Sequence, residues 1–399
     1  MIRQATHSLA DALTMQLRQR LDVGLFLVVA ALIGFGLVMV ASSSIGVADR
    51  QYGNPLHFLI RQSVYIVVGL AVAYLVYEIP TRLWEAAGVS LLLMAFLVLV
   101  LVILPGVGKT VNGATRWVDL GVMVVQTSEI AKILVVLYMA GYIVRHGNSV
   151  RETLAGFVKP LVIVGLLTIL LLLEPDYGAA VVILMVTMGM LFLGGVRLPQ
   201  FIMLFAAVGT IFAILALTSP YRMQRLTSFL NPWDDPFNTG FQLSQSLIAI
   251  GSGSWFGLGL GSSVQKLFYL PEAHNDFMFA ILAEELGLVG VISVLLLFVF
   301  AVWRCFAIGA TAEKAGHFFG AYLSYGIGLW IGIQAFVNVG VNMGVLPTKG
   351  LTLPFMSAGG SSMIAMCVAV GLILRVHREV HDLTLKGYRA PRGSGGKAK

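Results

Sequence analysis

The chain has 399 residues, of which 58% are hydrophobic and only 11% are Asp, Glu, Lys or Arg. Soluble proteins carry roughly 25% of these four residues, so this chain has too few charges to cover a water-facing surface. The composition argues against a soluble enzyme, a disordered scaffold and a nucleic-acid-binding domain, and predicts a protein that lies mostly in lipid. The net charge of +7 is then explained by cytoplasmic loops and anionic lipid head groups.

Apolar runs long enough to cross a bilayer, about 20 residues each, recur along the chain. The run nearest the N-terminus is longer than the apolar core of a signal peptide and is followed by others, so we interpret it as a retained span. The sequence therefore predicts an all-α polytopic membrane protein with ten transmembrane helices. In chain order the runs cover residues 23–43, 63–79, 83–104, 123–144, 154–173, 177–195, 200–218, 277–303, 318–343 and 354–374.

Basic residues are distributed unevenly between the two sides that ten spans create. About two thirds of the Lys and Arg residues fall on the side of the two termini, which predicts that both termini are cytoplasmic. Three regions follow: a cytoplasmic segment at 1–22, a membrane domain at 23–374 and a basic cytoplasmic tail at 375–399. The two cysteines, Cys305 and Cys367, fit no disulfide or metal spacing and are interpreted as core residues.

A long segment, residues 219–276, separates the seventh and eighth predicted spans on the outer side. Its many aromatic residues argue against disorder, and long loops on rigid scaffolds commonly carry function. Within it, Phe241–Ile250 predicts a short amphipathic helix that could lie on the membrane. Five glycines between Gly251 and Gly261 indicate irregular, closely packed backbone of the kind found in re-entrant segments.

Charged residues inside or beside the spans are candidates for function because charge in lipid is costly. Glu129 and Lys132 lie on one face of the fourth span, where they form either a structural ion pair or the wall of a cavity or ion path. Glu174 and Asp176 flank Pro175 between two spans, and we interpret them as acids at the water interface.

Titratable residues also gather where the long outer loop meets the eighth span. Glu272, His274 and Asp276 follow one another closely there, with Glu284 and Glu285 farther along the same predicted helix. Asp276 is suited to be a helix N-cap, but acids grouped beside an apolar cleft are also candidate general acids and bases. The residue pattern alone leaves both interpretations open.

Several motifs in family order resemble the SEDS family (shape, elongation, division and sporulation). The resemblance spans nearly the whole chain, agrees with the ten-span count, and is closer to the division branch of the family than to the elongation branch. The matching stretches are NGATRW at 112–117, Gln126, Ser128-Glu129, Lys132, NPWDDPF at 231–237, GFQLSQS at 240–246, GLGLG at 257–261, Gln265-Lys266, YLPEAHNDF at 269–277, PTKG at 347–350 and SAGGSS at 357–362.

This resemblance implies a peptidoglycan glycosyltransferase of the inner membrane, acting at the division septum on lipid II. The 4-hydroxyl of one chain's GlcNAc attacks the MurNAc anomeric carbon of another, and undecaprenyl pyrophosphate leaves. Asp276 matches the family's essential acid and is assigned as the general base. The alternatives are an elongation-type (RodA-like) polymerase of the same family, a lipid II flippase, and a scaffold that only recruits division proteins.

The resemblance also implies partners and binding residues. It implies a class B penicillin-binding protein transpeptidase (FtsI-like) and other division membrane proteins (FtsQ-, FtsL- and FtsB-like) as partners, no nucleic acid, and no organic cofactor. A divalent cation (Mg²⁺ or Mn²⁺) could share in neutralising the pyrophosphate, and the metal ligands stay unknown. Glu129 and Lys132 become a cavity-lining pair that supports the site. The residues expected to bind pyrophosphate and sugar are Arg61, Arg116, Lys349, Gln245, His274, Glu272 and Ser361.

Two positions depart from the common family pattern. Asn275 stands where the family usually has threonine between the histidine and the catalytic acid. Ala358 stands where the family usually has tyrosine, next to the paired glycines. Neither change removes the acid, and the second is expected to reshape the pocket near the tenth span.

Overall fold

The computed structural model describes residues 21–111, 114–119, 121, 123–218, 229–238, 240–267, 270–347 and 350–385. Helices dominate these residues, and a small antiparallel sheet stands between α5 and α6 in the order β1-β2-β3. The elements are α2 (Val23–Tyr52), α3 (His57–Glu78), α4 (Thr81–Ala86), α5 (Gly88–Ile103), β1 (Gly108–Val111), β2 (Ala114–Asp119), β3 (Val124–Gln126), α6 (Thr127–Glu152), α7 (Leu154–Leu173), α8 (Tyr177–Leu193), α9 (Leu198–Leu217), α11 (Phe241–Ser252), α12 (Met278–Lys314), α13 (Phe318–Asn342) and α14 (Gly360–Leu385).

The predicted class, an all-α polytopic membrane protein, is confirmed. Seven helices of the described residues are long and apolar enough to cross a membrane: α2, α3, α6, α7, α12, α13 and α14. The shorter apolar helices α5, α8 and α9 lie at the three remaining predicted positions. The count of ten spans and the cytoplasmic position of both termini stay predictions.

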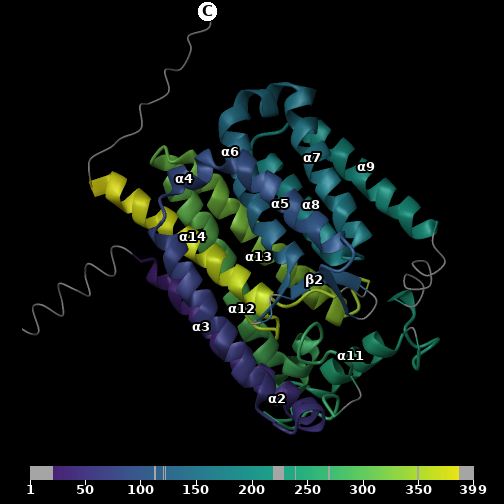
Figure 1. Cartoon of the computed structure of the whole chain (residues 1–399). Helices are drawn as coiled ribbons and strands as arrows, with labels where there is room; N and C mark the ends of the chain where they lie inside the picture. The colour runs from purple at the N-terminus through teal and green to yellow at the C-terminus, as the bar shows by residue number, and fades with distance from the viewer. Residues whose placement is uncertain are drawn as a thin grey trace, which may run out of the picture.

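Helix α6 runs through the middle of the bundle and is buried along most of its length, whereas α9 lies at the edge (Figure 1). The pairs α3 with α14 and α12 with α13 pack along their lengths. Gly371 explains how closely α14 approaches α3, because a Cβ atom at this position would lie 2.5 Å from the Ala73 carbonyl oxygen. Both cysteines are buried, as predicted.

The bundle has two polar ends. One carries the sheet, α11 and the segments that precede α12 and α14; it is the end predicted to face outside, and we call it the outer end. The opposite end is held by ion pairs between helices, including Arg304 with Asp22 and Arg378 with Glu78. The polar residues at the two ends leave a mostly apolar layer between them, as a membrane protein requires.

The sheet was not predicted. Lys109 pairs with Trp117 across β1 and β2, and Trp117 pairs with Gln126 across β2 and β3. The fourth span, predicted from residue 123, therefore begins only at Thr127, because the residues before it complete the sheet. Asn-Gly between two runs rich in Val and Thr is a hairpin signal, and residues 112–113 carry it in the sequence.

The long loop before α12 follows the prediction where it is described. Helix α11 confirms the short helix expected at 241–250, and it buries Leu243, Ser246 and Ala249 on one face. The glycine-rich segment after it leaves helical geometry and packs directly on α12, as irregular re-entrant backbone would. The described part of the loop is therefore folded against the outer end.

Candidate functional site

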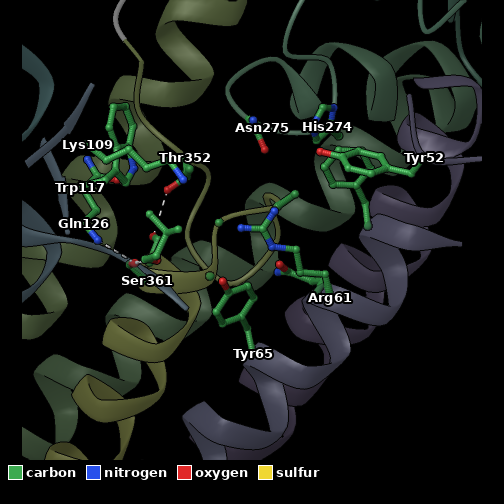
Figure 2. A pocket seen from close by; sticks show the side chains of 17 residues that line it. Tyr52, Arg61, Tyr65, Lys109, Trp117, Gln126, His274, Asn275, Thr352 and Ser361 are labelled. Carbon is green, nitrogen blue, oxygen red and sulfur yellow. Dashed lines mark hydrogen bonds between the residues drawn. The ribbon is translucent and has the colours of Figure 1, made fainter. Parts of the chain in front are cut away.

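A cavity of about 470 Å³ opens at the outer end, between α3, the sheet and the segments that precede α12 and α14 (Figure 2). Figure 2 shows Arg61 and Tyr65 on α3 facing it from one side, and Trp117, Gln126 and Ser361 from another. The lining mixes aromatic rings with hydroxyl, amide and cationic groups. The lining residues are Tyr52, Phe58, Arg61, Gln62, Tyr65, Lys109, Trp117, Val124, Gln126, His274, Asn275, Thr352, Ala358, Gly359, Gly360, Ser361 and Ser362.

Asp276 directly follows the lining residue Asn275 in the chain and is not itself among the residues that line the cavity. Its backbone oxygen accepts hydrogen bonds from the side-chain amides of Asn338 and Asn342 on α13, at 2.9 and 3.0 Å. Gly350 leaves room for the Asp276 carboxylate, since a Cβ atom on this glycine would lie 3.0 Å from Oδ2. The backbone of Asp276 is thus held from two helical turns of α13 while its side chain has space.

The N-cap interpretation of Asp276 is wrong, because the N-cap of α12 is Phe277 and the first-turn amide of Ala280 donates to Asn342 Oδ1 on α13 at 3.2 Å. The Asp276 carboxylate makes no hydrogen bond with the residues that the structure describes. Burial raises its pKa to about 7; Glu272 and Asp176 add to the rise, and Arg116 opposes it. A carboxyl group with a pKa near 7 and no hydrogen-bond partner among the described residues is suited to exchange a proton at neutral pH.

The segment before Asp276 forms a tight turn. Glu272 has a positive φ of 56°, and its backbone oxygen accepts from the amides of Asn275 and Phe277 at 3.0 and 3.3 Å. The side-chain amide of Asn275 donates to the Glu272 carboxylate at 2.5 Å. Asn275, which departs from the family pattern, therefore both closes this turn and lines the cavity.

The loop before α14 fixes the same segment from the other side. Ser357 Oγ donates to the Asn275 carbonyl at 2.6 Å, and the Ala358 amide donates to the His274 carbonyl at 3.0 Å. The His274 ring packs against Phe58 with 4.5 Å between ring centroids, and burial lowers its pKa. His274 is therefore neutral at physiological pH and presents a polar but uncharged surface to the cavity.

Glu174 and Asp176 are buried, so the interpretation that they are solvated interface acids is wrong. Asp176 accepts hydrogen bonds from Gln126 at 3.0 Å and Ser128 at 2.8 Å, and its carboxylate lies 3.5 Å from Arg116. Burial raises the pKa of Glu174 to about 8, and Asp176 adds to the rise. Because Asp176 also acts on the pKa of Asp276, this pair of acids belongs to the electrostatic surroundings of the site.

The three cations expected to bind pyrophosphate have different surroundings. Arg61 lines the cavity and has no carboxylate within ion-pair distance among the described residues. Arg116 lies over Trp117 and is paired with the buried acid Asp176. Lys349 lies outside the described residues. A further cation, Lys109, lines the cavity and pairs with Asp119 at 3.0 Å; sequence inspection missed it.

Glu129 and Lys132 form the predicted ion pair, with 2.9 Å between Nζ and Oε1 and both side chains buried. Lys132 also donates to Gln334 Oε1 at 2.8 Å, and the Gln334 amide donates to the Thr352 carbonyl at 3.0 Å. Thr352 lines the cavity. The pair is thus connected to the cavity lining through Gln334 and Thr352.

Comparison with known proteins identifies the family. The family model FTSW_RODA_SPOVE, described as "Cell cycle protein", matches residues 23–382. The chain belongs to the SEDS family. It is 61% identical over 376 residues to the probable peptidoglycan glycosyltransferase FtsW of Thioalkalivibrio sulfidiphilus, covering 94% of each chain. It is 51% identical over 361 residues to the probable peptidoglycan glycosyltransferase FtsW of Coxiella burnetii, covering 90% of this chain and 97% of that one.

Solved structures agree with the SEDS fold. A chain from a study of how a peptidoglycan synthase complex coordinates polymerization and crosslinking matches with a TM-score of 0.75 and 31% identity. The match covers 90% of this chain and 98% of that one. The rod shape determining protein RodA of Thermus thermophilus matches with a TM-score of 0.66 and 29% identity, covering 90% and 97% of the two chains.

The structure of this SEDS protein brings together some of the predicted site residues and separates others. Arg61, His274 and Ser361 line one cavity, and the Ser361 hydroxyl accepts from the Gln126 backbone amide at 2.9 Å. Glu272 is exposed and Gln245 lies on α11, and neither lines the cavity. The assignment of these last two to substrate binding therefore gains no support from the geometry.

The described residues contain no group of three or more His, Cys, Asp or Glu side chains able to hold a metal ion. A magnesium site that uses one or two carboxylates together with phosphate oxygens does not need such a group. The divalent cation of this SEDS protein accordingly stays a proposal, and it would depend on the phosphate groups of a bound substrate.

Proposed function

We propose that the chain polymerises lipid II into glycan strands, with Asp276 as the general base. The observation that supports this most is the Asp276 carboxylate, which follows the cavity-lining residue Asn275 in the chain, has a pKa near 7 and makes no hydrogen bond with the described residues. The relatives named as probable peptidoglycan glycosyltransferases support the reaction class. A group at the outer end of the bundle suits a sugar that is carried on a lipid and presented outside.

In the proposed reaction the 4-hydroxyl oxygen of the acceptor GlcNAc attacks the anomeric carbon of the donor MurNAc. The new glycosidic bond forms as the bond to the pyrophosphate oxygen breaks, and Asp276 takes the hydroxyl proton. Undecaprenyl pyrophosphate leaves with the bonding electron pair. The proton on Asp276 then passes to solvent, which returns the carboxylate for the next addition.

The lining of the cavity fits a phosphorylated saccharide. Amide and hydroxyl groups of Gln62, Asn275, Thr352 and Ser361 can exchange hydrogen bonds with sugar hydroxyls. Tyr52 and Phe58 offer apolar ring surface on the same wall. Arg61 supplies a cation that no carboxylate of the described residues neutralises, as the departing pyrophosphate requires. A divalent cation would share that charge when bound.

Arg61→Gln is expected to lower kcat/KM for polymerisation by about 10²-fold, because one cation facing the leaving group is lost. Initial rates of glycan formation from lipid II in proteoliposomes measure this effect. Arg82→Gln, an exposed arginine at the opposite end of the bundle, is the matched control and keeps the wild-type rate. An Arg61→Gln rate within twofold of wild type would exclude Arg61 from leaving-group stabilisation.

The pH profile of polymerisation should follow the ionisation of Asp276. The base must be deprotonated, so the rate is expected to rise with pH up to about 7 and to level off above it. Arg116→Gln should move this midpoint to higher pH, because Arg116 lowers the pKa of Asp276. Initial rates between roughly pH 5 and 9 give both midpoints. If wild type and Arg116→Gln have the same midpoint, the charge of Arg116 does not act on the group whose ionisation controls the rate.

We also propose that the protein acts at the division septum together with a class B penicillin-binding protein transpeptidase. The supporting observations are relatives named FtsW and the structural match to a chain of a peptidoglycan synthase complex. The decisive experiment incubates the reconstituted wild-type protein with lipid II, with and without the cognate transpeptidase. Glycan strands in the presence of the partner support the proposal. Movement of lipid II across the bilayer without any glycan product would instead favour the flippase alternative.

A further inference from the structure

Helix α12 consists of two helices separated by Gly287, whose φ of 64° and ψ of −165° are not helical. The first, residues 278–286, begins two positions after Asp276, and its residues from Met278 to Glu285 are all buried. A rigid helix of this length spans about 14 Å. A displacement at its far end is therefore transmitted to Asp276.

The glycine-rich segment closes the break between the two helices. The amides of Leu258 and Gly259 donate to the carbonyl oxygens of Glu284 and Glu285, each at 3.0 Å. The last carbonyl groups of a helix have no amide donor within that helix. The glycine-rich segment supplies the amide donors for these two carbonyls. A Cβ atom on Gly257 would lie 2.1 Å from the Glu285 carbonyl oxygen, so only glycine permits this contact.

Two buried carboxylates stand at the same break, and the proposed reaction uses neither. Glu285 accepts hydrogen bonds from Ser42 on α2 and from Lys266 Nζ, both at 2.7 Å. Glu284 accepts from Ser263 Oγ at 2.5 Å and from the Val264 amide at 3.0 Å. These residues join α2, the loop and the first half of α12 into one polar cluster.

Lys266 is the cation of this cluster among the described residues. Its side chain is 11% exposed, and it contacts Ser42 at 3.0 Å as well as Glu285. A cation at the C-terminal end of a short helix is favoured by the helix dipole, and a buried carboxylate needs a charged partner. Lys266 therefore fixes the end of the helix whose other end leads to Asp276.

We infer that Lys266 is a positioning residue for the proposed glycosyl transfer. By neutralising Glu285 it holds the first half of α12 in place, and so sets where the Asp276 carboxylate meets the acceptor hydroxyl. This inference rests on the proposed function. It assigns the loop before α12 a task in catalysis although Lys266 does not line the cavity.

The test measures polymerisation of lipid II by reconstituted full-length variants. Lys266→Met is expected to lower kcat by about 10²-fold with KM within about threefold, because a small misplacement of the base affects chemistry and leaves substrate binding intact. Lys266→Arg should restore kcat to within about tenfold of wild type, since it keeps the charge. The double variant Lys266→Met with Glu285→Gln should also recover, because residue 285 then carries no charge that has lost its cation.

Lys314→Met, at the exposed opposite end of α12, is the matched control and keeps wild-type kinetics. Hydrogen exchange over residues 276–286 is measured in parallel, and faster exchange is expected in Lys266→Met alone. Wild-type kcat in Lys266→Met, a loss confined to KM, or a double variant no better than the single one would overturn the inference. If the wild-type protein makes no glycan, the proposed function fails, and unchanged exchange in Lys266→Met would separately overturn the positioning role.

Discussion

Replacing Asp276 by asparagine is expected to lower the rate of lipid II polymerisation by about 10²- to 10⁴-fold, the usual contribution of a general base. The amide keeps the size of the side chain but cannot take the acceptor proton. The backbone bonds from Asn338 and Asn342 to the Asp276 carbonyl stay in place, so the local fold is not disturbed. Initial rates at saturating lipid II, measured with the transpeptidase partner present, give the effect on kcat.

Asp49→Asn is the matched control, because Asp49 is an exposed carboxylate near the C-terminal end of α2 and does not line the cavity. It should polymerise at the wild-type rate. A folded Asp276→Asn or Asp276→Ala protein that polymerises lipid II as fast as wild type would remove Asp276 from the reaction. Another residue would then have to act as the general base. The next candidate is the buried Glu174, whose pKa is also raised.

The substitution Asp276→Asn should also stabilise the protein above pH 7. The pKa of Asp276 is raised from 3.8 to about 7 in the folded state, so the folded protein keeps a proton that the unfolded chain has released. The free energy of unfolding therefore falls as pH rises from 3.8 to about 7. Above pH 7 the ionised carboxylate destabilises the fold. The amide introduced by Asp276→Asn carries no such charge, and Tm should rise by at least about 2 °C at pH 8. Gain of stability with loss of rate marks a residue kept for function.

Local sequence patterns predicted the features of this fold that depend on local chemistry. Apolar runs located the spanning helices, because a helix in lipid satisfies its own backbone groups. Glycine spacing located the irregular segment that follows Ser252, where a Cβ atom on Gly253 or Gly257 would overlap the backbone of α12, whereas residues 251–252 still belong to α11. The titratable residues around Asp276 could be seen as a group because they are neighbours in the chain.

Features that depend on distant parts of the chain were missed. Glu174 and Asp176 were assigned to water because an acid beside Pro175 looks like a solvated turn, and nothing nearby in sequence shows that Arg116, Gln126 and Ser128 come to meet them. Lys109 was missed because it reaches the cavity only through pairing of the strands. Buried polar groups need partners, but which residues those partners are is set by tertiary packing.

The buried pair of Glu129 and Lys132 is expected to produce the largest effect on stability. Lys132→Met leaves the Glu129 carboxylate inside the bundle without its cation, which should cost about 3–5 kcal/mol. The variant should be poorly expressed and should unfold at lower temperature in detergent. Glu129→Gln with Lys132→Met removes both charges, and Tm is expected to return close to the wild-type value. Thermal unfolding of the purified proteins measures both effects.

Activity of the neutral double variant separates the two interpretations of the pair. A purely structural ion pair predicts that polymerisation recovers together with Tm. Support of the cavity predicts about a tenfold lower rate. Gln334 Oε1 loses the donor Lys132 and, among the described residues, keeps the donor Trp330, so the amide that holds Thr352 is less firmly fixed. Arg378→Gln, which breaks a half-exposed pair with Glu78 at the opposite end, should change neither quantity by much. We expect the second outcome, since Thr352 lines the cavity proposed to hold the substrate.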